Sequence, residues 1–341
     1  MGEISFGKTG LTFEQCGFGA LPIQRVSEEV AVGLLRKAYD GGIRYFDTAR
    51  AYTDSEVKVG KAFAGMRDKV LLATKTMGRT GEKVEKELAQ SLENLQTDYI
   101  DVYQVHNPDF CPLPGGKDGV YDALLDAKAA GKIRFIGFTN HRLKIAWEAV
   151  KSGLYDTLQF PFSYLSGEQE AQLAGACKER GMGFVAMKAL SGGLITDAAA
   201  AYAWIMRFSG VVPIWGVQRE EELDQFLSFM QDPPVLDAKM RAVIDADRKE
   251  LKGDFCRGCG YCMPCPAGIE INTCARASLL LRRAPTNLVL SEEGQAMMRK
   301  IPECTECGQC KKRCPYGLDT PALLKKNYQD FLDVLDGKVA I

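Results

Sequence analysis

Eight of the twelve cysteines lie in two short runs near the end of the chain. The first run reads CRGCGYCMPCP at residues 256–266, and the second reads CTECGQCKKRCP at residues 304–315. Both runs repeat the C-x2-C step and end in Cys-Pro. Thiolates are soft ligands that select zinc or the iron of iron-sulfur clusters. This concentration of thiols therefore predicts a metal centre.

The second run has the spacing C-x2-C-x2-C-x3-C-P, which in bacterial sequences binds [4Fe-4S] clusters. Three thiolates of such a run hold one cluster and the fourth binds the other. The first run is one residue shorter before its last cysteine, so a single cluster is an alternative to two. Zinc is a second alternative, because paired C-x2-C motifs also suit tetrahedral zinc sites. We predict two clusters, one held by Cys256, Cys259, Cys262 and Cys314 and the other by Cys304, Cys307, Cys310 and Cys265.

Four polar residues in the first third of the chain have types that fit acid catalysis. Asp47, Lys75 and His106 stand at the ends of short apolar runs, and Tyr52 follows Asp47 by five residues. A tyrosine hydroxyl, with a pKa of about 10 in water, protonates an alkoxide at neutral pH if its environment lowers that pKa. We expect Lys75 to lower the pKa of Tyr52 by favouring the phenolate, Asp47 to hold Lys75, and a neutral His106 to polarise a carbonyl.

The elements that must position these residues alternate between buried strands and amphipathic helices. Helical stretches such as SEEVAVGLLRKAYDGG and TGEKVEKELAQSLENLQ place apolar residues at three- and four-residue steps. Eight such units favour a closed parallel (β/α)8 barrel, an α/β fold whose chemistry lies at the C-terminal ends of the strands. The eight expected strands are residues 16–20, 43–49, 69–75, 99–106, 133–139, 157–162, 183–189 and 211–217.

Two further segments complete the predicted architecture. ISFGKTGLTFEQ, near the start of the chain, alternates apolar and polar residues around a Gly-containing turn, which predicts a β-hairpin over one mouth of the barrel. The cysteine runs and the helices expected between them predict a small ferredoxin-like α-helical domain. We therefore expect a barrel domain at residues 1–245 and an iron-sulfur domain at residues 246–341.

Composition excludes several classes of function. The formal net charge of 341 residues is -1, so no basic excess indicates binding to nucleic acid. No uncharged apolar run approaches the length of a membrane span, and the first residues lack the pattern of a signal peptide. We expect a cytoplasmic protein without membrane or nucleic-acid partners, in which cysteines serve metal or redox chemistry.

As a set, the segments YFDTARAY, LLATK, DVYQVHN and GKIRFIGFTN resemble those of the aldo-keto reductases, and the whole chain resembles the branch that carries a C-terminal ferredoxin-like domain. The resemblance implies a (β/α)8 barrel that transfers hydride from NADPH, sometimes NADH, to an aldehyde or ketone. It also implies catalytic roles for Tyr52, Lys75, Asp47 and His106.

The same resemblance implies residues that bind the nicotinamide cofactor. Asn140 and Gln159 match the residues that bind the carboxamide, and Met187 stands where many members stack an aromatic ring. The strand-eight region would receive the adenosine phosphate, with Arg219 a candidate for pairing with the 2′-phosphate of NADP. The complete set of expected cofactor contacts is Asn140, Gln159, Met187, Lys188, Leu190, Gly216, Gln218, Arg219 and Glu222.

Three functions remain open from the sequence. The favoured one is carbonyl reduction at Tyr52, with the clusters structural or redox-sensing. Because hydride carries two electrons and a [4Fe-4S] cluster ordinarily carries one, the second is electron transfer through a bound FMN or FAD to or from a ferredoxin or another carrier. The third is a redox-sensing subunit without catalysis. A small carbonyl substrate and a second copy of the chain are the other candidate partners.

Overall fold

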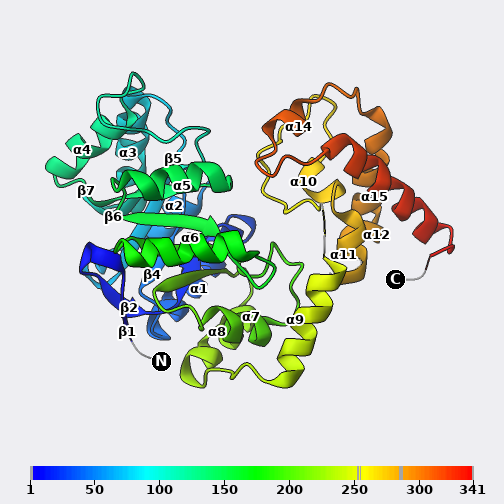
Figure 1. Ribbon diagram of the computed structural model, residues 1–341, viewed down its shortest axis with the longest axis horizontal. Coiled ribbons are helices and arrows are strands. Elements are labelled where there is room, and N and C mark those ends of the chain that lie inside the picture. The colour runs from blue at the N-terminus through cyan, green and yellow to red at the C-terminus, as the bar shows by residue number, and fades with distance from the viewer. Residues whose placement is uncertain (1–2, 252, 254, 284–286, 340–341) are drawn as a thin grey trace. The chain divides into compact units, whose positions relative to one another are not determined.

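The computed structural model describes residues 3–251, 253, 255–283 and 287–339, so the outermost limits of the expected domains, residues 1 and 341, lie outside it. The chain divides into two compact units (Figure 1). The first comprises Met1–Ala189 and Ala199–Asp237, and the second comprises Leu190–Ala198 and Ala238–Ile341. The second unit thus takes a short segment that follows the seventh barrel strand in addition to the C-terminal part of the chain.

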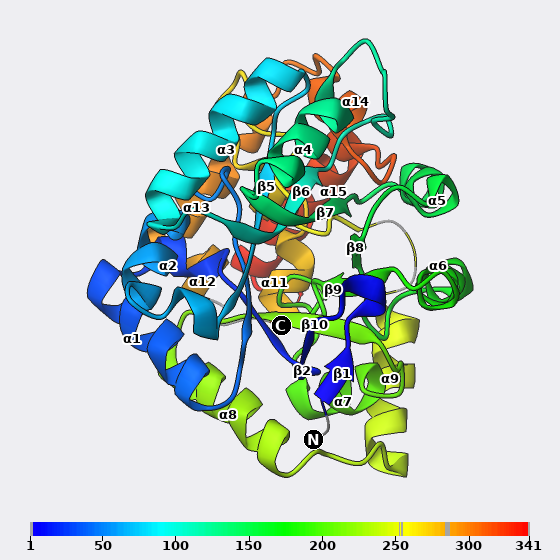
Figure 2. The same cartoon turned by 90° about the vertical axis from the view of Figure 1, so that its left-hand side faces the viewer.

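The first unit is a closed barrel of eight parallel strands, as predicted (Figure 2). Its strands follow one another in chain order around the barrel, and the last pairs with the first, Trp215 opposite Phe18. Each strand lies within or next to the segment expected from its apolar run. The strands are β3 Gly17–Gly19, β4 Tyr45–Asp47, β5 Leu71–Thr76, β6 Ile100–His106, β7 Ile133–Thr139, β8 Thr157–Pro161, β9 Gly183–Met187 and β10 Val211–Gly216.

A helix follows each strand of the barrel along the chain and covers its outside. Ser27 and Thr80 cap the first and third of them, each accepting a hydrogen bond from the third backbone N–H beyond it. These helices bury one apolar face, such as Leu34 and Leu35 on the first. They are α1 Glu28–Asp40, α2 Ser55–Phe63, α3 Gly81–Leu95, α4 Val120–Ala129, α5 Leu143–Ser152, α6 Glu168–Glu179, α7 Ala198–Ile205 and α8 Glu220–Gln231.

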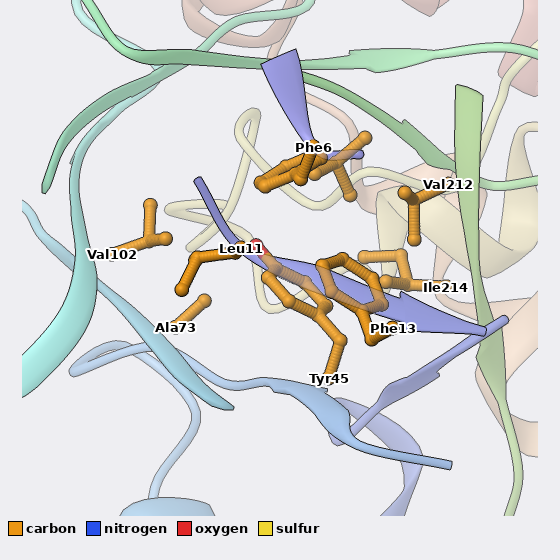
Figure 3. Close-up of a cluster of buried hydrophobic side chains, with 9 residues drawn as sticks. Phe6, Leu11, Phe13, Tyr45, Ala73, Val102, Val212 and Ile214 are labelled. Atoms are coloured by element: carbon orange, nitrogen blue, oxygen red, sulfur yellow. The ribbon is translucent and has the colours of Figure 1, made fainter. Parts of the chain in front are cut away.

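A β-hairpin closes the barrel at the N-terminal ends of its strands, which confirms the expected cap. Strands β1 (Glu3–Ser5) and β2 (Thr12–Glu14) pair antiparallel on either side of a short 3-10 turn. Phe6 and Phe13 pack against Tyr45, with ring centroids 5.6 and 5.4 Å away (Figure 3). This apolar plug leaves the opposite mouth, where the strands end, for chemistry.

The second unit is helical in its described residues beyond 237. Its longest helix, α15, buries Leu324 and Phe331, and Asn327 ties it to α11 by accepting a hydrogen bond from Ser278 N at 2.8 Å. The helices are α9 Ala238–Glu250, α10 Ile271–Cys274, α11 Ala277–Arg283, α12 Asn287–Leu290, α13 Glu292–Arg299, α14 Gln309–Arg313 and α15 Thr320–Leu335. In the part of the chain that the structure describes, no helix has both the length and the apolar character needed to cross a bilayer.

Candidate active site and iron-sulfur centre

The four residues expected to carry acid catalysis lie at the C-terminal ends of neighbouring strands. Asp47 ends β4, Lys75 is the last but one residue of β5, and His106 ends β6. Tyr52 lies in the loop between β4 and α2. Because β4, β5 and β6 pair side by side, the residues at their ends face one region of the barrel mouth.

Lys75 and Asp47 form a buried ion pair beneath Tyr52. Lys75 Nζ lies 2.5 Å from Asp47 Oδ1, and their side chains are only 1% and 2% exposed. Nζ also donates to the backbone oxygen of Thr48 at 2.6 Å. Burial lowers the pKa of Lys75, and the carboxylates of Asp47 and Glu56 oppose this effect. The pair thus fixes a charged ammonium within the barrel.

Two glutamine side chains complete the shell around Asp47. Gln104 Nε2 donates to Asp47 Oδ2 at 3.0 Å, and Gln159 Nε2 donates to Oδ1 at 3.2 Å. Sequence reasoning missed Gln104 as part of this site. The period-two alternation of a strand could have found it, because Gln104 precedes His106 by two residues on β6 and therefore faces the same side.

A buried carboxylate on α2 forms a second layer that the sequence did not predict. Glu56 is 1% exposed, pairs with Arg50, and accepts hydrogen bonds from Thr74 and Ser91, both at 2.7 Å. Its charge contributes to holding Lys75 in the ammonium form. No local pattern distinguishes it from an ordinary glutamate in the first turn of a helix.

The environment of Tyr52 differs from the expectation in one respect. Its half-buried ring lies 5.9 Å from that of His106 in an edge-on arrangement, and Lys75 Nζ is 5.1 Å from its centroid. The pKa of Tyr52 is raised, chiefly by burial and then by the charge of Asp47, whereas the sequence led us to expect a lowered value. The positive charge of Lys75 is already matched by Asp47, so little of it remains to stabilise a phenolate. Tyr52 therefore keeps its proton at neutral pH.

His106 is buried among positive groups at the end of β6. Burial is the main reason that its pKa lies well below the usual value, and the charges of Lys75 and Arg79 add to this effect. Arg79 also donates to the backbone oxygen of His106 at 2.7 Å, which fixes the end of the strand. The imidazole is consequently neutral at physiological pH and can donate one hydrogen bond without carrying a charge.

We expect the ring of His106 to remain neutral as the pH falls through about 6.5, the region in which an unfolded histidine takes up its proton, because burial lowers its pKa well below the usual value. The stabilisation from the neutral ring is present above about pH 6.5 and is lost as the pH falls, since the unfolded chain then binds the additional proton. NMR of the two histidine rings measures this directly, with His106→Gln providing the assignment. A His106 resonance that titrates near pH 6.5 would contradict the prediction.

Asn140 and Gln159, the residues expected at the carboxamide, lie together across β7 and β8. Asn140 N donates to Gln159 O at 3.1 Å, and both side chains are buried. Asn140 Nδ2 donates to Pro108 O at 2.8 Å, which leaves its second hydrogen for a ligand. Gln159 Oε1 is buried and has no hydrogen-bond partner among the described residues. An amide N–H of a bound cofactor would satisfy it, so the residues fit a nicotinamide carboxamide.

The expected cofactor residues after β9 fall on both sides of the division between the units. Met187 ends β9 and Lys188, with a φ of +57°, follows it in the first unit, whereas Leu190 begins the segment assigned to the second. Within the second unit, Arg276 donates to Gly192 O at 2.8 Å and Arg283 to Leu194 O at 3.1 Å. The segment that starts at Leu190 is thus held by residues of the C-terminal part.

The expected adenosine-phosphate residues lie at the start of α8, where an internal carboxylate already binds. Glu222 Oε2 accepts from the backbone N–H groups of Gln218 and Arg219 at 3.0 and 3.2 Å, and its Oε1 pairs with the Arg219 side chain at 2.6 Å. Gly216 ends β10 just before this turn. A phosphate at Arg219 would have to compete with Glu222, so this arginine alone gives little preference for NADP over NAD.

The second unit gathers the first predicted cysteine set around one cavity. Cys256, Cys259, Cys262 and Cys314 line a space of about 350 Å³. Arg257 also lines it, with its guanidinium 4.7 and 4.5 Å from the ring centroids of Phe255 and Tyr316. Burial raises the pKa of Cys256, and it raises the pKa of Cys262 to about 12. Ligand binding by these thiols must therefore release protons.

The second predicted set surrounds another cavity in the same unit. This space of about 360 Å³ is lined by Cys265, Cys304, Cys307 and Cys310, with Cys262 shared between the two cavities. Each cavity is thus lined by three predicted ligands from one run and by one from the other run. Cys16, Cys111, Cys177 and Cys274 line neither cavity.

The spacing of these thiols bears on the choice between clusters and zinc. In the described ranges, no three His, Cys, Asp or Glu side chains converge closely enough to hold a single metal ion. Tetrahedral zinc needs its sulfur ligands at about 2.3 Å from one point, whereas a [4Fe-4S] cluster separates its thiolates by its own body. The eight thiols that line the two cavities are ligands of the type that [4Fe-4S] clusters take.

Comparison with known proteins extends these observations. The chain is 33% identical over 213 residues to L-galactose dehydrogenase of Arabidopsis thaliana, covering 57% of this chain and 66% of that protein. It is 28% identical over 230 residues to an NADH-specific methylglyoxal reductase of Escherichia coli, covering 58% and 69%. The chain thus spans about two thirds of the length of these curated relatives.

Solved structures share the barrel at lower identity. An aldo-keto reductase from Klebsiella pneumoniae in complex with NADPH has a TM-score of 0.62 at 24% identity, covering 72% of this chain and 95% of that one. The holo form of an aldo-keto reductase from Bacillus halodurans has a TM-score of 0.63 at 23% identity, covering 72% and 96%. At these identities the likeness is one of fold.

The matching families cover both parts of the chain. The Aldo/keto reductase family matches residues 4–200, which include Asp47, Tyr52, Lys75 and His106. The 4Fe-4S dicluster domain matches residues 255–319, which include all eight cysteines of the two runs. Taken with the barrel and the cysteine-lined cavities, these matches mean that the chain belongs to the aldo/keto reductase family and carries a 4Fe-4S dicluster domain after its barrel.

Proposed function

We propose that the barrel reduces an aldehyde or ketone to an alcohol with a nicotinamide dinucleotide as the reductant. The observation that carries this proposal is the buried Lys75–Asp47 pair beneath a protonated Tyr52 and beside a neutral His106. The arrangement offers a neutral proton donor and a neutral hydrogen-bond donor in one region, which is what a carbonyl oxygen requires as it becomes an alkoxide.

The roles of the residues follow from their protonation states. NADPH or NADH, when bound, supplies hydride to the carbonyl carbon. Tyr52 gives its hydroxyl proton to the carbonyl oxygen, so that the substrate gains two electrons and two hydrogens, and the phenolate regains a proton from water. His106 donates a hydrogen bond that orients the oxygen. Lys75 and Asp47 form the buried pair beneath Tyr52, and this pair supports the ring next to His106.

Asn140 and Gln159 would hold the carboxamide of the cofactor. Gln159 fits this role because its buried Oε1 lacks a partner among the described residues while its Nε2 is engaged by Asp47. The cofactor and the catalytic carboxylate are thereby connected through one side chain. The Arg219–Glu222 pair supports a barrel that accepts either NADPH or NADH.

We infer that the second unit holds two [4Fe-4S] clusters, each with three thiolates from one run and the fourth from the other. The two cavities support this number, since each is lined by the four thiols of one predicted set and Cys262 borders both. Such clusters supply one-electron chemistry. In the favoured arrangement carbonyl reduction takes place at Tyr52 without them. In the alternative a flavin in the barrel mouth would exchange single electrons with them.

One spectroscopic experiment separates these arrangements. The protein is purified without oxygen, and its visible spectrum is recorded before and after NADPH, and again after a panel of aldehydes. We expect broad iron–thiolate absorption that NADPH leaves unchanged, together with aldehyde-dependent oxidation of NADPH. Bleaching on NADPH, with flavin released on denaturation, would establish the flavin alternative. A colourless protein that contains zinc would overturn the cluster assignment.

A matched pair of cysteine variants tests the ligand sets. Cys265→Ser is expected to lower the iron content by about half, because Cys265 supplies the fourth thiol of the second set. Cys274→Ala is the control: Cys274 belongs to the same unit and is buried, but it lines neither cavity. Iron per chain is measured by colorimetric chelation. Equal iron loss in both variants would contradict the assignment of Cys265.

A further inference from the structure

The two cysteine sets differ in how close they come to solvent. Of the twelve cysteines, all within the described ranges, Cys307 alone is exposed. Its neighbours Thr305 and Glu306 are exposed as well, so the second cavity reaches the surface along this turn. In the first set Cys262 is buried and the other three are partly buried. The second set is therefore the one at which an electron can enter or leave most directly.

Basic side chains surround this exposed edge. Helix α14, which contributes Cys310 to the second set, carries Lys311, Lys312 and Arg313 on its exposed surface. Helix α15 packs beside α14 and adds exposed Lys325 and Lys326 (Figure 1). Residues 300–326 contain six basic and three acidic side chains, although the chain as a whole has a net charge of -1.

Ion pairs within this region leave part of the positive charge unmatched. Lys311 pairs with Asp319 at 2.7 Å, and Lys325 pairs with Glu306 at 2.5 Å. No carboxylate of the described residues lies within ion-pair distance of Lys312 or Arg313. Arg313 Nη1 donates only to the backbone oxygen of Met263 at 3.4 Å. These two cations are thus available to an external anionic surface.

We propose that this basic face, defined as Lys311, Lys312, Arg313, Lys325 and Lys326 around Cys307, is the docking surface for an acidic one-electron carrier protein. The proposal rests on the proposed clusters. Complementary charge accelerates encounter and suits the small, transient interfaces of redox partners. One electron passes between the carrier and the second cluster, so that one is oxidised as the other is reduced, and no bond is formed or broken.

The test uses the anaerobic holoprotein and a small acidic ferredoxin as the probe. Stopped-flow absorbance follows electron transfer from the reduced ferredoxin, and the dissociation constant of the fully oxidised pair is measured separately by calorimetry. The double variant Lys312→Glu/Arg313→Glu reverses the unmatched charges. Its control, Lys239→Glu/Lys249→Glu, makes the same charge change on exposed positions of α9 in the same unit.

In the wild-type protein the rate constant is expected to fall steeply with rising salt. The double variant is expected to lose about tenfold or more in rate constant and to bind the oxidised ferredoxin more weakly, whereas the control stays near the wild type. Reduction by methyl viologen radical should be equal in all three. The proposal would be overturned if the double variant reacted as fast as the wild type, or if the control were slowed equally. Tighter binding of duplex DNA than of the ferredoxin would also overturn it.

Failure of the cluster assignment gives a different result. A protein without iron would be identified by its iron content and by the lack of reaction with methyl viologen, before any carrier is added. An iron-loaded protein that methyl viologen reduces but that neither binds nor reacts with the ferredoxin would reject the docking surface alone.

Discussion

Replacing Tyr52 with Phe is expected to lower kcat for carbonyl reduction by ~10²–10⁴-fold, which is the usual contribution of a positioned proton donor. Phe keeps the ring that lies beside His106 and above Lys75 but lacks the hydroxyl that donates the proton. Cofactor binding should therefore change little. The measurement is NADPH oxidation with a reactive aldehyde, together with the dissociation constant of NADPH from fluorescence quenching.

Tyr39→Phe provides the matched control for this experiment. Tyr39 is another half-buried tyrosine of the barrel, but it lies on α1, where its ring packs near Phe63 and Arg44. Its variant should retain the wild-type rate. If Tyr52→Phe did so too, Tyr52 would not be the acid, and a binding subunit without catalysis would become the better interpretation.

Breaking the Lys75–Asp47 pair should have the largest effect on stability. Lys75→Met leaves a buried carboxylate, and Asp47→Asn leaves a buried ammonium, so each change is expected to cost ~3–5 kcal/mol of unfolding free energy. The double variant removes both charges and should cost less than the sum of the two. All three should lose carbonyl reduction, because the buried pair that supports Tyr52 next to His106 is lost.

Fluorescence isolates the unfolding of the barrel from that of the second unit. Trp147, Trp204 and Trp215, the three tryptophans of the chain, all belong to the first unit, so their emission in a denaturant titration reports that unit alone. Lys61→Met removes the exposed pair with Glu28 and is the control, with an expected cost of ~1 kcal/mol or less. Strictly additive losses at Asp47 and Lys75 would contradict the coupling.

The sequence predicted the barrel and the position of Asp47, Lys75 and His106 at one mouth of it, because both depend on local pattern. Each strand is a short apolar run, and parallel strands that close into a barrel must end at the same mouth, so residues at their ends meet. This rule alone was enough to predict that Asp47 and Lys75 lie close together. The sequence also predicted the four thiols that line each cavity, since three closely spaced cysteines in each run leave the fourth for the other set, but it did not predict that Cys262 borders both cavities.

The electrostatics of the site could not be predicted in the same way. The pKa of Tyr52 depends on how deeply its loop folds over the barrel and on whether the charge of Lys75 is already matched. Glu56 approaches Lys75 from α2, and its burial results from packing between helices and strands. Likewise, the assignment of Leu190–Ala198 to the second unit arises from Arg276 and Arg283, which lie far away in sequence.

The exchange of one cysteine between the two runs has a consequence for how the protein matures. Each proposed cluster joins the 256–265 run to the 304–314 run, so both clusters cross-link the same two segments. The first cluster to form bears the entropy cost of bringing the two runs together across residues 266–303, and the second then finds its ligands already close together. Assembly should therefore be cooperative: cells limited for iron would contain fully loaded and empty chains, with few chains that hold a single cluster.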